Sequence, residues 1–212
     1  DGPGEAAYSA VFHAIATFNN AGISLYSDNL TRFVGDPIVV GAVTMGFIIG
    51  GLGFPILVEL HRRGRIGRSA DIAVSSARPW SLHLKVTLLA TVLLLFVGPA
   101  IVLSFEWTNP DTLGMLDLGD KLLAGWFQGV TPRTAGFNTI DFGSMNEPTL
   151  FLVSALMFIG AGPASTSGGI KVTTFAVLGF VLWAEIRGER DVHVFRRRLP
   201  TAMIRQALTI AL

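Results

Sequence analysis

The feature that most restricts the fold is the hydrophobic run at residues 149–184, in which Lys171 is the only charged side chain. This run has 36 residues. A single helix of that length would extend about 54 Å, whereas the hydrocarbon core of a bilayer is only about 30 Å thick. We therefore expect the run to break into two elements. The small residues of GAGPASTSGGIKVTT at 160–174 mark the position of the break.

A break at membrane depth restricts what can surround it. Lipid cannot form hydrogen bonds with freed backbone groups, so non-helical backbone inside a bilayer lies against protein or against a water-filled cavity. The sequence therefore predicts a membrane protein in which residues 160–174 border an aqueous cavity. The composition agrees, because 50% of the residues are hydrophobic and only 15% are charged.

Two further runs are long enough to cross a membrane. Residues 38–58 and 86–105 have no charged side chain and contain 21 and 20 residues. Buried helices of a large soluble protein are the alternative, although such runs seldom occur in water. The shorter apolar runs at 6–18 and 122–130 suggest half-depth helices that re-enter the membrane. Because the chain ends within another apolar segment, we expect it to be an excerpt of a longer protein.

The basic residues predict the orientation in the membrane. Segments 61–85 and 185–205 hold twelve of the sixteen Lys and Arg residues, whereas the connections at 106–121 and 141–147 are mainly acidic. Loops rich in Lys and Arg usually face the cytoplasm. We therefore expect both basic segments inside the cell, with the half-depth helices entering from outside. The net charge of +1 does not indicate a nucleic-acid partner.

The two short apolar runs belong to an internal repeat. FHAIATFNNAGIS at 12–24 aligns with WFQGVTPRTAGFNT at 126–139, so that Ala21-Gly22 matches Ala135-Gly136. A single Ala-Gly pair is an ordinary turn after a helix. Its recurrence after two short helices favours a turn with a shared function.

The repeat continues into the longer runs. Asp36-Pro37 and Glu147-Pro148 precede the two spans, and Gly50 and Gly160 lie 13 and 12 residues after those prolines. A repeat unit therefore consists of a short helix, an Ala-Gly turn, an acidic outer loop and a span broken by glycine. Internal repeats around a site at the membrane midplane are typical of transport proteins.

Three motifs, NNAGIS, TPRTAGFNT and GPASTSGGIKVTTF, occur in this order along the chain. In these motifs the sequence resembles the Trk/Ktr/HKT superfamily of potassium transporters, most closely the membrane subunit of bacterial Ktr systems. The resemblance implies an all-α membrane protein with a K⁺-channel-like pore. In that fold four repeats of outer helix, pore helix, filter and inner helix surround one pore, and this chain would hold about two of them.

The resemblance also implies a division of the chain. It assigns 4–60 to the pore helix, filter and inner helix of repeat two, 61–81 to a cytoplasmic basic loop, 82–187 to a complete repeat three with an intramembrane gating loop at 160–174, 188–202 to a second cytoplasmic basic loop, and 203–212 to the start of the outer helix of repeat four. It further implies K⁺ as the transported ion with no other cofactor, a homodimer in the cytoplasmic membrane, and a cytoplasmic nucleotide-binding regulatory subunit of the KtrA/TrkA type. Sodium transport in the family is associated with serine at the first filter, which lies outside this chain.

A selectivity filter replaces the hydration shell of an ion with backbone carbonyls, and a glycine at positive φ helps to turn those carbonyls inward. The predicted filter residues, whose carbonyls would hold K⁺, are Asn20, Ala21, Gly22, Ile23, Thr134, Ala135, Gly136 and Phe137. Each pore helix would point its negative carboxyl-terminal end at the cation. Arg133 either braces the filter through a carboxylate such as Asp141 or lies on the surface of the outer mouth.

The glycine-rich stretch is the predicted gate. Its proposed gating residues are Gly160, Gly162, Gly168, Gly169 and Lys171. Glycine allows alternative backbone shapes, and a lysine in the cation pathway would repel K⁺ when the loop is closed. The alternative is a static kink from which the lysine side chain reaches the cytoplasm.

Two other classes of function are open at this point. A secondary solute carrier with broken helices would show a buried side-chain binding site instead of repeated Ala-Gly turns. An ATP-driven pump would need a nucleotide domain, which is not found in this excerpt and which a longer chain could contain. The pattern of a phosphate-binding loop fails, because Ile170 separates Gly169 from Lys171. With no cysteine and no metal-ligand spacing among four histidines, we expect no enzyme.

Overall fold

The computed structural model describes residues 2–66, 80–133, 135–189, 191–195 and 197–211. Its elements in chain order are α1 (Pro3–Phe18), η1 (Thr31–Phe33), α2 (Pro37–Leu52), α3 (Phe54–Ile66), α5 (Leu82–Glu106), α6 (Leu118–Val130), η2 (Phe142–Ser144), α7 (Glu147–Phe158), α8 (Val172–Ile186), β1 (His193–Val194), β2 (Arg197–Arg198) and α9 (Thr201–Ala211). The all-α prediction is confirmed, since the strands of the described part are one antiparallel pair of two residues each.

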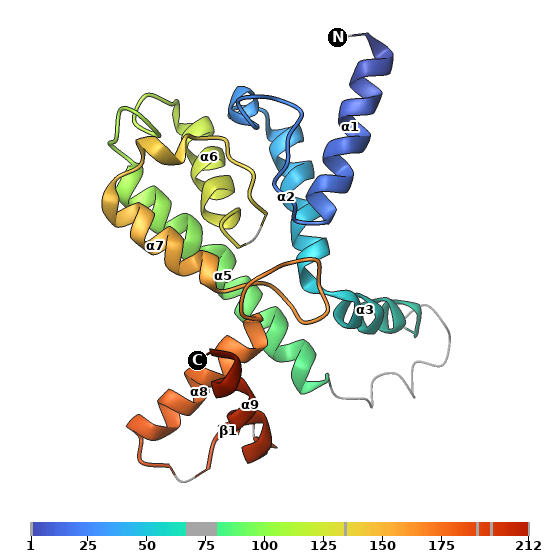
Figure 1. Cartoon of the computed structure of the whole chain (residues 1–212), viewed down its shortest axis with the longest axis vertical. Coiled ribbons are helices and arrows are strands. Elements are labelled where there is room, and N and C mark those ends of the chain that lie inside the picture. Colours follow the sequence, from blue (N-terminus) through green and yellow to red (C-terminus); the bar gives the residue numbers. More distant parts are fainter. Residues whose placement is uncertain (1, 67–79, 134, 190, 196, 212) are drawn as a thin grey trace.

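Helix α5 is the long diagonal element of Figure 1, and it confirms the span predicted at 86–105. It is the one unbroken helix of the described residues that is long and apolar enough to cross a membrane. It packs closely on α6, because Gly98 and Gly129 face each other without side chains. A Cβ built on Gly98 would lie 2.0 Å from the carbonyl oxygen of Gly129. Any larger residue at this crossing would therefore separate the two helices.

Helices α2 and α3 form the first broken span. Asp36 caps α2 by accepting from the backbone N–H groups of Ile38 (2.9 Å) and Val39 (3.1 Å), and Pro37 follows as the first helical residue. The chain then bends by 97° between the two helices. The joining residue is Gly53 at φ +88°, in a region that is open to glycine and strained for other residues.

This bend corrects two predictions. Residues 38–58 are not one straight crossing, and the interruption falls at Gly53 rather than at Gly50. Gly50 lies inside α2, where a Cβ would come within 2.0 Å of the carbonyl oxygen of Phe18. Because α3 continues to Ile66, the expected boundary between inner helix and basic loop at 60/61 falls within a helix.

Helices α7 and α8 are separate apolar helices, so the hydrophobic run 149–184 breaks as its length predicted. The connecting loop comprises residues 159–171, so Val172–Thr174 of the predicted loop belong to α8 instead. Its two ends are joined by hydrogen bonds from Gly160 N to Ile170 O (2.8 Å) and from Ile170 N to Phe158 O (3.2 Å). Figure 1 shows this loop, in orange, extending towards the junction of α2 and α3.

The half-depth helices end where the sequence predicted. Helix α1 ends at Phe18 and α6 at Val130, the last residues of the apolar runs 6–18 and 122–130. Helix α1 packs against α2, and α6 packs against both α5 and α2. The core between them is a cluster of buried side chains, which includes Ala16, Val40, Phe47, Phe127, Ala135 and Phe137. This core fixes both helix ends relative to each other.

The outer ends of α5 and α7 are joined through the buried carboxylate of Glu106, which is 0% exposed. It accepts hydrogen bonds from Asn109 Nδ2 (2.7 Å), Thr112 Oγ1 (2.8 Å), Asn146 N (2.9 Å) and Thr149 Oγ1. A buried carboxylate is costly unless donors compensate it, and here four donors do so. Glu106 thereby fixes the start of α7 to the end of α5.

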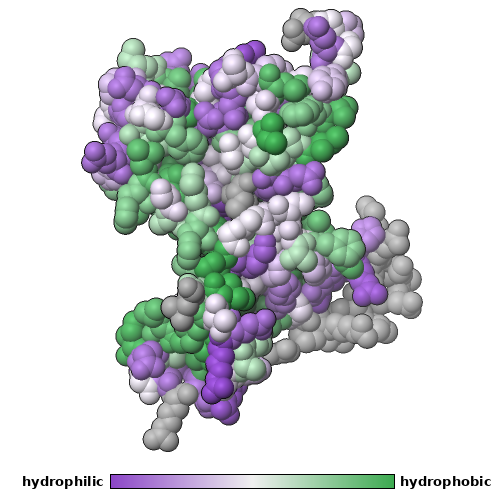
Figure 2. Space-filling model, viewed as in Figure 1, coloured by the Kyte–Doolittle hydropathy of each residue, from purple (hydrophilic) through white to green (hydrophobic). Residues whose placement is uncertain are grey.

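Large apolar side chains cover much of the outer surface. Figure 2 shows the widest hydrophobic area at the lower left, around α8. Among the outward-facing residues are Leu89 of α5 and Leu182 and Trp183 of α8, which are 56%, 64% and 56% exposed. Surfaces of this kind suit contact with lipid or with further protein.

Candidate functional site

The two predicted filter turns lie against each other. Gly22 has φ +66° and Gly136 has φ +76°, so both take the left-handed backbone that the sequence led us to expect. A Cβ built on Gly22 would lie 2.7 Å from the Cα of Gly136, and one on Gly136 would lie 3.0 Å from the Cα of Gly22. Glycine is therefore required at both positions for conformation and for space.

The carboxyl-terminal ends of α1 and α6 hold these turns. Ala21 N donates to Ala16 O at 2.9 Å. In the second turn Ala135 N and Gly136 N both donate to Thr131 O, at 3.1 and 3.4 Å. The last carbonyls of a helix carry partial negative charge. Each turn thus lies beside the negative end of a half-depth helix.

Most carbonyls of the two turns have no hydrogen-bond partner among the described contacts. Among the described hydrogen bonds, none ends on the carbonyls of Asn20, Ala21, Gly22, Ile23, Ala135 or Gly136. Phe137 differs from the expectation, because its carbonyl accepts from Thr131 Oγ1 at 2.5 Å and so faces α6. Thr134, the remaining predicted filter residue, lies outside the described residues.

Two asparagines connect the segments that follow the turns. Asn138 N donates to Asn29 Oδ1 at 3.2 Å, and Leu30 N donates to Asn138 O at 3.1 Å. Asn29 adopts φ +56°, a left-handed conformation that asparagine tolerates better than most residues. Residues 29–30, which follow the first turn, therefore bind Asn138, which lies two residues after Gly136 of the second turn.

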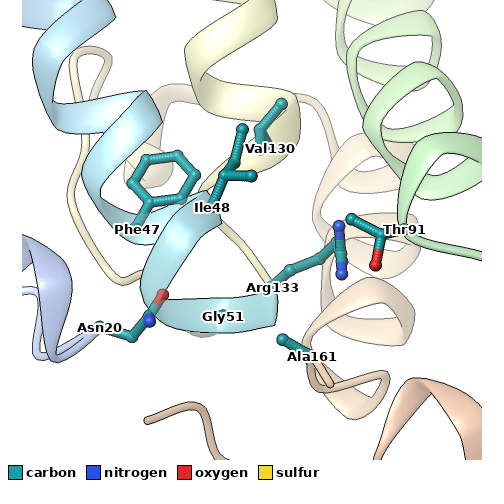
Figure 3. Close-up of a pocket in the computed structure, with 8 residues that line it drawn as sticks. All are labelled: Asn20, Phe47, Ile48, Gly51, Thr91, Val130, Arg133 and Ala161. Carbon is teal, nitrogen blue, oxygen red and sulfur yellow. The ribbon is translucent and has the colours of Figure 1, made fainter. Parts of the chain in front are cut away.

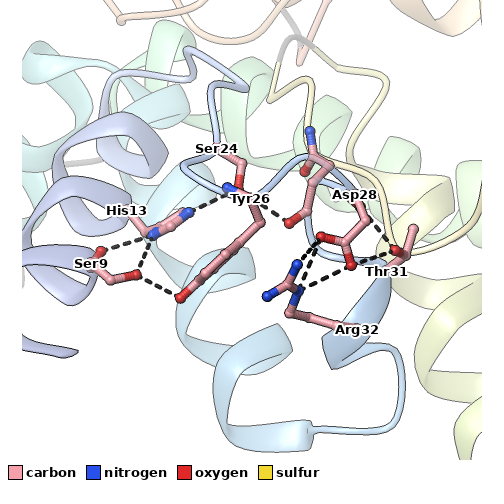
Figure 4. A network of polar contacts seen from close by, with 8 residues as sticks. Ser9, His13, Ser24, Tyr26, Asp28, Thr31 and Arg32 are labelled. Carbon is pink, nitrogen blue, oxygen red and sulfur yellow. Dashed lines mark hydrogen bonds and ion pairs between the residues drawn. The ribbon is translucent and has the colours of Figure 1, made fainter. Parts of the chain in front are cut away.

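Sequence reasoning missed a polar network beside the first turn, drawn in Figure 4. His13, which lies on α1 one turn from Ser9 and from Thr17, is 9% exposed. Its Nδ1 lies 2.8 Å from Ser9 O, and its Nε2 lies 3.0 Å from Ser24 Oγ. The signal in the sequence was a histidine inside a short apolar helix, which we had considered only as a metal ligand.

The outer part of this network contains an ion pair. Arg32 donates to both carboxylate oxygens of Asp28, and its guanidinium carbon lies 4.4 Å from the centroid of the Tyr26 ring. Hydrogen bonding from Arg32 lowers the pKa of Asp28 to about 2. Asp28 therefore stays ionised throughout the physiological pH range.

Arg133 agrees with neither alternative drawn from the sequence. It is 8% exposed, so it is not a surface residue, and among the described contacts it forms no ion pair with Asp141, whose side chain instead binds Gly143 N and Ser144 Oγ. In Figure 3 the guanidinium points towards Thr91 of α5. It lines a cavity of about 20 Å³ together with residues that include Asn20 and Gly51. Within the described residues its Nε has no hydrogen-bond partner.

The loop 159–171 is anchored to the first filter turn through Thr166. Asn20 Nδ2 donates to Thr166 Oγ1 at 2.8 Å, and the same hydroxyl donates to Phe18 O at 2.9 Å. The loop 159–171 therefore contacts the end of α1.

The same loop also satisfies the backbone groups that the bend in α2–α3 sets free. Gly162 N donates to Gly51 O at 2.8 Å, and Phe54 N donates to Ala164 O at 3.2 Å. Groups at a helix end need such partners, above all at membrane depth. The break in one span is thus filled by the loop of the other.

The four predicted gating glycines occupy different parts of the loop. Gly160 and Gly162 lie against backbone: a Cβ on Gly160 would be 2.0 Å from Gly168 O, and one on Gly162 would be 2.2 Å from Leu52 O. Gly169 takes φ +68°, and Gly168 has open space around it. Lys171 is half-buried and donates its ammonium to Ser167 O within the loop.

Comparison with known proteins places this geometry in context. The family model described as TrkH, cation transport protein, matches residues 4–212. The chain is 45% identical over 204 residues to the Ktr system potassium uptake protein B of Bacillus subtilis, with 96% of this chain and 43% of the relative covered. It is 40% identical over 203 residues to the protein of the same name from Vibrio alginolyticus, again with 96% and 43% covered.

Two further comparisons agree. The potassium/sodium uptake protein NtpJ of Enterococcus hirae is 34% identical over 204 residues, which cover 95% of this chain and 42% of that protein. The crystal structure of the potassium transporter TrkH from Vibrio parahaemolyticus matches with a TM-score of 0.68 at 20% identity, over 95% of this chain and 42% of that one. The chain spans less than half the length of the relatives that it matches.

Proposed function

Because this chain belongs to the TrkH family of cation transport proteins, we propose that it forms two adjacent repeats of a K⁺ uptake pore in the cytoplasmic membrane. Its repeats would be those expected from the sequence, with filters at 20–23 and 134–137. The observation that carries this proposal is the contact of Gly22 and Gly136, both at positive φ and each beside the carboxyl-terminal end of a half-depth helix.

The chemistry of the two turns suits a dehydrated monovalent cation. Carbonyl oxygens without other hydrogen-bond partners can replace water around an ion, and the helix ends add negative potential. In this proposal the carbonyls of Asn20, Ala21, Gly22, Ile23, Ala135 and Gly136 coordinate K⁺ at successive levels. Thr134 would extend this series. Phe137 O acts differently, because its bond to Thr131 fixes the turn to α6.

Two features support the loop 159–171 as the gate of this pore. It contacts the end of α1 through Thr166, so it lies immediately next to the first filter turn. Its other contacts are mainly single backbone hydrogen bonds to the α2–α3 junction, which can exchange for water at low cost. Lys171 would place its positive charge in the cation pathway when the loop is closed.

The assembly that we propose follows the family. The complete transporter would be a homodimer of membrane subunits bound to a cytoplasmic nucleotide-binding subunit. The basic segments at 61–85 and 185–205 would face that subunit, in accord with the orientation of Lys- and Arg-rich loops.

The filter is tested by Gly22→Ser and Gly136→Ser in the complete transporter, with K⁺ and Na⁺ uptake measured in cells that lack other K⁺ uptake systems. Each change should lower the K⁺/Na⁺ uptake ratio, because a Cβ strains the backbone that aims the carbonyls. Gly188→Ser is the matched control, since Gly188 has a similar φ of +67° but open space around it. If the two filter variants keep the ratio of the wild type, the filter assignment is wrong.

A further inference from the structure

We propose that His13 and Ser24 form a proton-sensitive clasp that positions the first filter turn, so that external pH changes the ion selectivity of the pore. The proposal rests on the proposed filter and deepens it. His13 is a positioning residue in this scheme, because it acts on the turn through Ser24 and does not contact the ion.

The position of one proton on His13 follows from its partners. Nδ1 lies 2.8 Å from the carbonyl oxygen of Ser9 and 3.2 Å from its hydroxyl oxygen. The carbonyl is the nearer partner and only accepts hydrogen bonds, so we place a hydrogen on Nδ1. In the neutral ring Nε2 must then be the acceptor, and the Ser24 hydroxyl donates to it over 3.0 Å.

Ser24 has a second acceptor within reach, and this makes the clasp sensitive to protons. Its Oγ lies 3.1 Å from Asn29 O, yet a hydroxyl has only one hydrogen to donate. While His13 is neutral, the Ser24 hydroxyl can donate either to His13 Nε2 or to Asn29 O, and the other acceptor lacks this hydrogen bond. When Nε2 gains a proton it donates to Ser24 Oγ, and the serine hydrogen is free to bind Asn29 O.

The protonated arrangement satisfies every group. Ser24 Oγ then accepts from His13 Nε2 and from Tyr26 N (3.1 Å), and it donates to Asn29 O. Asn29 holds the second filter segment, because its Oδ1 accepts from Asn138 N at 3.2 Å. Ser24 and Asn138 each lie two residues after a filter glycine, so a proton on His13 tightens the connection between the two turns.

The other ionisable groups near His13 are either paired or distant from it, so the proposed pH effect is assigned to His13. The Tyr26 ring stacks on it at 5.1 Å between centroids, and beyond Tyr26 lies Arg32, whose charge is balanced by Asp28. Helix α2, which also packs against α1, has no ionisable side chain within Pro37–Leu52. Glu5, on α1 itself, is exposed near the helix start. Histidine is the side chain that commonly changes charge between pH 5 and 8.

The experiment measures the K⁺/Na⁺ uptake ratio of the complete transporter at external pH values from 5 to 8. We expect the ratio to rise about fivefold as the pH falls from 8 to 5, which corresponds to the net effect of about one hydrogen bond. Ser24→Ala and His13→Phe should flatten this profile. His193→Gln, in β1 and far from α1 in Figure 1, should keep the profile.

Two results would overturn the proposal: a wild-type ratio that does not change with pH, or a folded Ser24→Ala protein with the wild-type profile. Ser24→Ala removes one hydroxyl and keeps the test decisive even if His13→Phe fails to fold. If Gly22→Ser and Gly136→Ser alter the ratio but Ser24→Ala keeps the wild-type pH profile, the clasp is wrong and the filter assignment stands. If neither glycine change alters the ratio at any pH, the filter assignment fails first.

Discussion

The hydroxyl of Thr166 donates a hydrogen bond of 2.9 Å to the carbonyl of Phe18, the last residue of α1, and so ties the loop 159–171 to the end of a half-depth helix. The same hydroxyl accepts from Asn20 Nδ2. One side chain therefore makes both side-chain contacts between the proposed gate and the first filter segment that the described residues show.

Thr166→Val should loosen the gate, because valine keeps the shape of threonine but can neither donate nor accept. Loss of two hydrogen bonds, each worth about 1 kcal/mol, should raise K⁺ uptake without the cytoplasmic partner by about thirtyfold. Thr209→Val is the control, since Thr209 makes a similar 2.9 Å bond to Arg205 O within α9. Equal uptake by both variants would show that Thr166 does not hold the gate.

Lys171 has two separable roles, a positive charge in the proposed ion pathway and a hydrogen bond to Ser167 O. Lys171→Gln removes the charge and keeps a donor, whereas Lys171→Met removes both. If repulsion of K⁺ dominates, both variants should raise uptake to a similar extent. If only the methionine variant raises uptake, the hydrogen bond that folds the loop is the important part. Wild-type uptake and regulation in both would identify the loop as a static hinge.

Glu106→Gln should destabilise the protein, because its amide NH2 replaces one carboxylate oxygen and would face the two donors that this oxygen binds. These are Asn146 N and Thr149 Oγ1 on one oxygen, or Asn109 Nδ2 and Thr112 Oγ1 on the other. Hydrogen bonds to a charged group contribute about 2 kcal/mol each, so a clear fall in the melting temperature of the purified transporter is expected. Glu185→Gln, at an exposed position of α8, should change that temperature little. If Glu106→Gln and the wild type have equal melting temperatures, the hydrogen bonds of Glu106 do not stabilise the contact between α5 and α7.

The Asp28–Arg32 pair gives a prediction about pH. The pKa of Asp28 is about 2 in the fold, below the value of about 3.9 expected for an unfolded chain. Its contribution is therefore complete above about pH 4 and is lost only as the pH falls towards 2. Asp28→Asn combined with Arg32→Gln removes both charges and should leave the shape of the selectivity profile between pH 5 and 8 unchanged. A changed profile in this double variant would assign the pH effect to the ion pair and not to His13.

The sequence was informative wherever length or a local signal decides the structure. The 36-residue run had to break, and Asp36-Pro37 and Glu147-Pro148 mark helix starts that the structure confirms. It could not choose among the glycines of GFIIGGLGFP, because the bend at Gly53 depends on contact with Pro163 and Ala164, more than a hundred residues away.

Tertiary packing also decided the residues that the sequence left open. Arg133 is adjacent to the filter in the chain, but its burial against α5 depends on how α6 crosses that helix at Gly98 and Gly129. The orientation of the Phe137 carbonyl depends on the Thr131 hydroxyl six residues earlier. Neither relationship has a periodic or compositional signature.

The right-angled bend at Gly53 has a mechanical consequence. Pro163 O lies where a Cβ of Gly53 would be, 2.3 Å away, so the elbow and the loop share one space. Turning α3 about that elbow must push on the loop, and displacing the loop must turn α3, since coupling between two sites is reciprocal. Helix α3 would thus act as a lever arm on the loop 159–171. Spin labels on α3 and on the loop should then change their distances to α5 together, and independent changes would refute the lever.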